Sequence, residues 1–380
     1  MSYKIYNIQS NEVLLKNILS DNFQKMLFPF NVIEKMFFLS KCKIQNNFVT
    51  PNRFMDNVIS LIFVSTVSLL HVVSLISHLV SNNAQTVTLI VVAFINLLLY
   101  CTGFFLHFIC KVVNTNVNVE FLLKLQHIYH CLYKTETCIK SAVLKSRLQV
   151  YFLVISNFVA IFWAMYFELA NYIDIIIVFV LLHFDVDMIY ASMMIQMIEQ
   201  FTMRWLEMLD SIEENNDWNK LFEVYLDLLQ AYELFKKIFK LSILFYVIQS
   251  FLVSLINIQL SLDKYRMNSN NIDTAQNVVK ASLVIAWIIK NYYLQIILSL
   301  SCERFNMSVE RVSTACTIRS ATTTSDAVEK TCKNIVRVNS VRVSAVSACG
   351  MFPVDADLPL RLAGLLATYT IVLLQFIFLK

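Results

Sequence analysis

Seven apolar runs, each about 20 residues long or longer, constrain what this chain can fold into. A helix needs about 20 apolar residues to cross the ~30 Å hydrocarbon layer of a bilayer. Only 15% of the residues are charged, whereas a soluble domain would carry about a quarter, so most of this surface must face something other than water. We therefore predict an all-α membrane protein with seven spans, at 54–80, 86–113, 150–170, 173–198, 241–262, 281–302 and 358–379.

Composition excludes several classes of function. The chain has 3 glycines and 4 prolines, too few for Gly-rich phosphate loops or dinucleotide folds and fewer than most transporters use. A net charge of +4 is too small to indicate nucleic acid binding. The nine cysteines include no CxxC pair, no Cys/His cluster has metal-ligand spacing, and no nucleophile–base pair is visible. We expect neither an enzyme nor a metal or cofactor site.

Basic residues are distributed unevenly between the connections. Lys and Arg are frequent in segment 1–53 and in the second, fourth and sixth connections. The first and third connections contain none, and the fifth has only Lys264, Arg266 and Lys280. Because basic loops are retained on the cytoplasmic side, the pattern predicts a cytoplasmic amino terminus and an extracellular carboxyl terminus. A G-protein-coupled receptor has the opposite orientation.

Two further segments outside the spans read as helices. Residues 27–39 form an apolar but short stretch that contains Glu34 and Lys35, so we expect a packed or interfacial helix there rather than a span. Between 199 and 240, apolar residues recur at helical spacing beside an acidic face. This pattern predicts helices that continue out of the membrane as a cytosolic platform.

The carboxyl-terminal segment carries a recognisable signature. It contains Gly350-Met-Phe-Pro-Val-Asp355, followed by Thr368-Tyr369, five residues, and Gln375-Phe376. This arrangement resembles the signature of insect gustatory receptors, in which Thr-Tyr and Gln-Phe lie in the last span after a turn of the Gly-x-Phe-x-Val-Asp type. Odorant receptors share the overall plan but generally not the full signature.

The resemblance implies a tetrameric, ligand-gated, non-selective cation channel in the plasma membrane of a chemosensory neuron dendrite. It divides the chain into a cytosolic segment (1–53), a six-span ligand-binding bundle (54–302), a cytosolic anchoring connection (303–357) and a pore-lining span (358–380). The expected partners are a small-molecule tastant, the lipid bilayer and related receptor subunits. Sugar-responding members usually carry Glu after Thr-Tyr, and Thr370 stands there in this chain, which favours bitter compounds.

One narrow face of the last predicted span carries small or weakly polar residues at steps of four, three and four: Gly364, Thr368, Ile371 and Gln375. Such a stripe can line water in an oligomer or allow close packing against a neighbouring helix, and the residues alone leave both open. The resemblance favours a pore with its gate at Gln375 and Phe376 and with Thr368 further in. Tyr369 is then a packing residue.

Charges and aromatic residues inside the spans are the remaining candidates. Lys290 and Asp185 lie at similar depths, which indicates either a buried ion pair or a ligand contact; Asp187 and His183, four apart, could bond each other. Aromatic side chains in the outer halves of the third and sixth spans suit either a pocket for apolar ligands or membrane anchoring: Trp163, Tyr166, Trp287, Tyr292 and Tyr293.

Two other functions compete with the channel. A G-protein-coupled or metabotropic receptor would need a basic-aromatic triplet after the third span and Asn-Pro-x-x-Tyr in the seventh, and neither is present. A secondary transporter or a non-channel scaffold is the other alternative. The odd number of spans and the lack of an internal repeat argue against an inverted-repeat transporter.

Overall fold

The computed structural model describes residues 18–45, 47–81, 87–133, 137–167, 172–211, 218–267 and 274–378. Within these residues, seven helices are long and apolar enough to cross a membrane. They are α3 (Phe54–Ser81), α4 (Val87–His107), α6 (Thr137–Tyr166), α7 (Tyr172–Ser211), α8 (Trp218–Met267), α9 (Thr274–Thr322) and α11 (Leu358–Phe378). Each overlaps one of the apolar runs, so the predicted seven-span, all-α class is confirmed.

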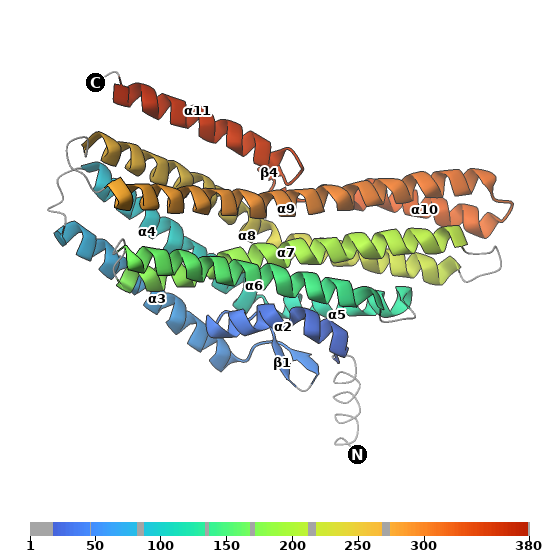
Figure 1. Ribbon diagram of the computed structural model, residues 1–380. Helices are drawn as coiled ribbons and strands as arrows, with labels where there is room; N and C mark the ends of the chain where they lie inside the picture. Colours follow the sequence, from blue (N-terminus) through green and yellow to red (C-terminus); the bar gives the residue numbers. More distant parts are fainter. Residues whose placement is uncertain are drawn as a thin grey trace, which may run out of the picture.

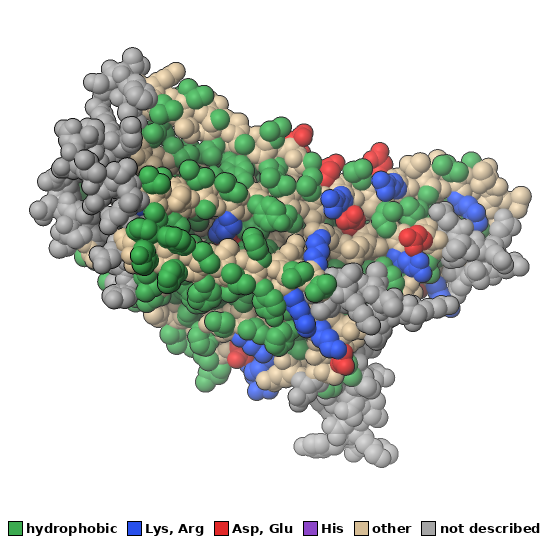
Figure 2. Space-filling view, in the orientation of Figure 1, with side chains coloured by type: hydrophobic (Ala, Val, Ile, Leu, Met, Phe, Trp, Pro, Cys, Tyr) green, Lys and Arg blue, Asp and Glu red, His purple; other side chains and the backbone are tan. Residues whose placement is uncertain are grey.

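Three of these helices are much longer than a bilayer is thick. Helices α7, α8 and α9 have 40, 50 and 49 residues, which corresponds to roughly 60–75 Å each. At one end of the molecule they are joined by α5 (Thr115–Leu132) and α10 (Asp326–Arg342) (Figure 1). Lys, Arg, Asp and Glu are most frequent across the middle of the molecule and toward this end, whereas hydrophobic side chains predominate on the described surface of the other half (Figure 2). The predicted helical extension at 199–240 is present in α7 and α8.

Large aromatic side chains hold this extension together. Trp205, Tyr225 and Tyr232 are each at most 1% exposed. The Trp205 indole N–H donates to the Leu221 carbonyl at 2.9 Å, and the Tyr225 hydroxyl donates to the Asn339 side chain of α10 at 2.8 Å. Because each buried polar atom has a partner, these residues add apolar contact without leaving an unsatisfied group. The extension is a packed core rather than a set of separate helices.

The amino-terminal elements pack beside the bundle. Helix α2 (Asp21–Met36) contacts α6 and α7, and the hairpin of β1 (Lys43–Gln45) and β2 (Phe48–Thr50) follows it. Its buried face consists of apolar residues at helical spacing, including Phe23, Leu27 and Phe30. The helix expected at 27–39 is therefore present as a packed helix, although it begins at Asp21.

Two local irregularities position later elements. A six-residue π-helical segment, η1 (Phe108–Val113), continues α4. Near the carboxyl end, β3 (Ser347–Ala348) and β4 (Phe352–Pro353) form a hairpin whose turn holds Cys349 at φ 52° and Gly350 at φ 77°. The second angle lies in the left-handed region that glycine adopts without steric penalty. This hairpin reverses the chain into α11, as the turn motif predicts.

Candidate functional site

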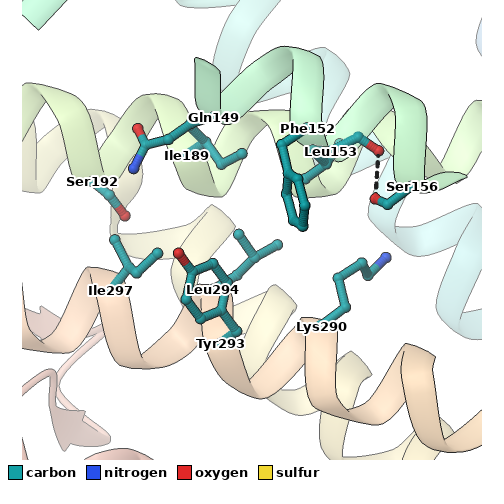
Figure 3. Close-up of a pocket in the computed structure, with 10 residues that line it drawn as sticks. All are labelled: Gln149, Phe152, Leu153, Ser156, Ile189, Ser192, Lys290, Tyr293, Leu294 and Ile297. Carbon is teal, nitrogen blue, oxygen red and sulfur yellow. Dashed lines mark hydrogen bonds between the residues drawn. The ribbon is translucent and has the colours of Figure 1, made fainter. Parts of the chain in front are cut away.

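An open pocket of about 490 Å³ lies where α6, α7 and α9 face one another (Figure 3). Ten residues line it: Gln149, Phe152, Leu153 and Ser156 from α6, Ile189 and Ser192 from α7, and Lys290, Tyr293, Leu294 and Ile297 from α9. In Figure 3 the Phe152 ring projects from α6 into the space between the helices. We call this space the α6–α9 pocket.

The walls of this pocket are mainly apolar, and few polar groups remain available inside it. Both serine hydroxyls are committed to their own helices, since Ser156 donates to the Leu153 carbonyl and Ser192 to the Met188 carbonyl. In the described part of the chain, no partner is found for the Tyr293 hydroxyl or the Gln149 amide. An apolar cavity with a few convergent polar groups suits a small organic molecule that carries a hydrogen-bonding group.

The one charged side chain at this pocket, Lys290, is held by a polar layer behind it. Its ammonium forms an ion pair with Asp185, which is 4% exposed. The Tyr246 hydroxyl lies 3.0 Å from Asp185 Oδ1 and 2.8 Å from Asn291 Oδ1. A smaller pocket of about 300 Å³ opens beside this layer and shares Lys290 with the first. The structure thus brings Lys290 and Asp185 together, and the lysine is both an ion-pair partner and a pocket residue.

Asp187 takes part in a different cluster, which sequence reasoning missed. Its Oδ1 lies 2.9 Å from Lys111 Nζ and 3.1 Å from Lys41 Nζ, and Lys41 also lies 2.8 Å from Glu34. These four side chains are at most 4% exposed. His183 contacts Lys111 at 2.9 Å rather than bonding Asp187. Positive and negative groups alternate along this row, so each buried charge has an opposite neighbour.

The lysines reach this cluster because of local backbone geometry. In η1 the wider π-helical turn places Lys111 on a buried face, where a lysine at the end of a span would ordinarily extend toward solvent. Lys41 lies five residues after the end of α2, and its ammonium is 3.3 Å from the centre of the Tyr190 ring. The charge pattern of the sequence counts both lysines among the basic residues on the cytoplasmic side. Glu34 inside an apolar stretch was the signal for a buried partner.

The five aromatic candidates separate into two groups. Tyr293 lines the α6–α9 pocket and Trp287 lines the smaller pocket, whereas Tyr292 lines neither. Trp163 and Tyr166 are 44% and 70% exposed, lie near each other on α6, and are not among the residues that line either pocket. Their exposure on an apolar helix fits membrane anchoring better than ligand contact.

Helix α11 packs against α8 and α9, and most of its other side chains are exposed. The small and weakly polar stripe is exposed at all four positions: Gly364, Thr368, Ile371 and Gln375. The Thr368 hydroxyl donates to the Gly364 carbonyl at 2.9 Å, and Tyr369 packs edge-on against Phe251 of α8. Phe376 lies within α11, but its side chain is outside the described part of the chain. Because the four residues are exposed in a single chain, another subunit or water can contact them.

Comparisons with known proteins agree with the seven-helix fold. The profile of the family described as 7tm Chemosensory receptor matches residues 57–380. The chain is similar to the insect olfactory receptor OR5 from Machilis hrabei in complex with eugenol, with 12% identity, a TM-score of 0.59, and coverage of 94% of this chain and 100% of that one. For a second OR5 structure the TM-score is 0.54, the identity 12% and the coverage 92% and 99%. This level of identity shows a common fold. No curated protein matches the chain.

Proposed function

The chain belongs to the 7tm chemosensory receptor family, and we propose that it is a ligand-gated, non-selective cation channel of the gustatory type. Its family and its seven apolar helices make it a multi-pass membrane receptor and not an enzyme. The gustatory assignment rests on the carboxyl-terminal signature, Thr368-Tyr369 and Gln375-Phe376. Thr370, at the position where sugar receptors usually carry Glu, favours bitter ligands.

The observation that carries this proposal is the α6–α9 pocket. It lies among membrane-spanning helices, its walls are apolar, and Lys290, Tyr293 and Gln149 supply the few polar groups. A small organic tastant with one hydrogen-bond acceptor matches this lining. The olfactory receptor of similar fold was solved in complex with eugenol, which supports a small organic molecule as the ligand of this chain.

The exposed stripe on α11 supports the proposal that this helix lines a pore. Four copies of the chain placed around one axis would bring their Gln375 and Phe376 side chains together as a constriction, with Thr368 and Ile371 lining the pore further in. A ring of apolar side chains closes a pore by excluding water, and uncharged amides discriminate weakly among monovalent cations. The segment 303–357, which holds α10, then anchors the subunits on the cytosolic side, with the amino terminus cytoplasmic and the protein in the plasma membrane.

The pocket is tested by whole-cell recording of the expressed chain with a panel of bitter compounds. Phe152→Ala removes an aromatic wall that is 71% exposed in the unliganded pocket. Losing the burial of such a ring against a ligand costs about 1.5–3 kcal/mol, so the half-maximal ligand concentration should rise about 10- to 150-fold. Phe162→Ala is the control, because Phe162 is 65% exposed on the same helix outside this pocket. Equal dose–response curves for both variants would remove the pocket from the proposal.

The gate is tested separately. At normal surface expression, Gln375→Ala and Phe376→Ala should raise the basal current or change cation permeability, whereas Leu374→Ala should not. Permeation that is indistinguishable in all three variants would place the gate elsewhere.

A further inference from the structure

A further open pocket, of about 680 Å³, lies outside the helices that form the ligand pocket. It occupies the corner between the end of α2, the β1–β2 hairpin and the start of α3, and we call it the α2–α3 pocket. Its lining combines two lysines, one carboxylate, small polar groups and two apolar side chains: Lys35, Phe38, Ser40, Cys42, Lys43, Asn52, Asp56, Ile59 and Ser60.

The charges of this pocket leave a positive surplus. The exposed Lys35 ammonium has no ion-pair partner within the described residues. Lys43 faces Asp56 at 3.8 Å, which is long for an ion pair, and Asp56 also accepts the Arg53 backbone N–H at 3.0 Å. The pocket lining therefore has two lysines but one carboxylate, and the Asp56 oxygen that faces Lys43, Oδ2, is the one that accepts the backbone N–H. The neighbouring Lys41 differs, because it is buried and paired with Glu34 and Asp187.

The polar floor of the pocket is preformed. Asn52 Nδ2 donates to the Ser40 carbonyl at 2.6 Å, and the Ser60 hydroxyl donates to the Phe38 carbonyl. Burial raises the pKa of the Cys42 thiol to about 12, so that side chain contributes no negative charge. The backbone of this corner is fixed by its own hydrogen bonds, and its lysines remain available to an anion.

Phe38 presents an aromatic ring at the pocket edge in a strained conformation. Its φ of 52° lies in the left-handed region, which is rare for an aromatic residue. The ring is 51% exposed and rests against Phe63 of α3 at 5.6 Å. A strained residue that exposes an apolar ring needs surrounding contacts to hold it, and such residues cluster at ligand sites.

Apolar surface continues from this ring along the membrane-spanning helix. Ile59, which lines the pocket, and Ile62, one turn on, are 48% and 61% exposed. Both lie in the first turns of a span that begins at Phe54. The pocket thus places a cationic, polar region directly beside the exposed apolar surface of a helix that is long and apolar enough to cross a membrane. A soluble phosphate would use only the first of these features, whereas a phospholipid would use both.

We propose that the α2–α3 pocket binds the head group of an anionic phospholipid. Lys35 and Lys43 contact the phosphate, and an acyl chain lies over Phe38 and Ile59. With the amino terminus cytoplasmic, as proposed above, this lipid comes from the inner leaflet, where anionic lipids are concentrated. Bound lipid would join α2 to α3, and α2 packs on α6, a helix of the ligand pocket.

The test uses the full chain in phosphatidylcholine nanodiscs that contain a brominated lipid as a contact quencher. Ile59→Trp places a fluorophore in the pocket wall, and the chain without this substitution gives the background from its four native tryptophans. Brominated phosphatidylserine should quench the added tryptophan several-fold more than brominated phosphatidylcholine at the same mole fraction. Nanodiscs expose both membrane faces, so the result is independent of the orientation and of channel activity.

Charge variants identify the site. The preference should disappear in Lys35→Gln/Lys43→Gln and persist in Lys25→Gln/Lys330→Gln, which removes the same charge at exposed lysines outside the pocket. Equal quenching by the two lipids, or a preference that survives Lys35→Gln/Lys43→Gln, would overturn the proposal. So would loss of the preference on addition of millimolar inorganic phosphate, because the site would then accept a soluble anion.

Discussion

Replacing Asp187 with Asn removes the one negative charge that lies between two buried lysines. Lys111 Nζ and Lys41 Nζ lie 2.9 and 3.1 Å from the same carboxylate oxygen, and the carboxylate is fully buried. The substitution Asp187→Asn keeps the shape of the side chain. Any loss of stability therefore reports the missing charge rather than a cavity.

The two lysines would be affected unequally. Lys41 would keep its ion pair with Glu34 at 2.8 Å, whereas Lys111 would keep only its contact with His183. At an effective dielectric constant of about 20, a pair at 3 Å attracts by roughly 5 kcal/mol before desolvation is counted. Removing one partner of a buried ion pair costs about 3–5 kcal/mol of stability, because the other charge is left uncompensated. We expect a loss of unfolding free energy in this range, mostly through Lys111.

The assay is unfolding of the purified chain in nanodiscs, followed by thermal denaturation and by amide hydrogen exchange. Exchange should rise most in η1, since Lys111 joins that segment to α7 and loses its ion-pair partner. Asp227→Asn is the control: Asp227 pairs with Lys124 at 2.8 Å, but its side chain is 25% exposed, and such pairs contribute about 0–1 kcal/mol.

A second substitution tests whether the uncompensated lysine causes the loss of stability in Asp187→Asn. In Asp187→Asn/Lys111→Met the uncompensated cation is also removed, so stability should recover much of the loss. If Asp187→Asn unfolds at the same temperature as Asp227→Asn, or if the double variant is no more stable than the single one, the buried-charge explanation is refuted.

Three further predictions follow from the geometry. Lys290→Met should reduce surface delivery more than it shifts ligand preference, because Asp185 loses its partner; normal delivery with altered dose–response would make Lys290 purely a pocket residue. Gly103→Ala should lower the unfolding temperature, since an added Cβ would lie 2.3 Å from Phe245, and an unchanged temperature would show that the ring moves freely. An amino-terminal tag should bind antibody only after permeabilisation, and a carboxyl-terminal tag in intact cells; surface labelling of the amino-terminal tag would reverse the topology.

The sequence predicts the helices well because length and apolarity determine them. Within the described residues each of the seven runs falls on a helix, and the helical spacing of apolar residues between 199 and 240, including Trp205, Tyr225 and Tyr232, already indicates the extension of α7 and α8. Helical hydrogen bonds and burial of an apolar face are local properties, so a pattern of residues suffices to locate them.

Long-range contacts between charged residues are harder to predict from the sequence. The similar depth of Lys290 and Asp185 makes an ion pair one of the two interpretations that the sequence offers, because both lie inside spans where an isolated charge is costly, and the structure shows that pair. Lys41 and Lys111 lie in segments where lysines usually reach water, and only the fold of α2 and the π-helical η1 brings them to Asp187. Sequence periodicity assumes regular helices and does not predict such a displacement.

Recording from the purified chain in a planar bilayer, with no other protein present, tests the central claim most directly. A bitter compound that activates the expressed receptor in cells should open single channels in this bilayer. The openings should discriminate little between Na⁺ and K⁺, and Phe152→Ala should require more ligand for the same open probability. A purified chain that binds the compound but never conducts, while its cellular response depends on GTP, would contradict the account and identify a metabotropic receptor.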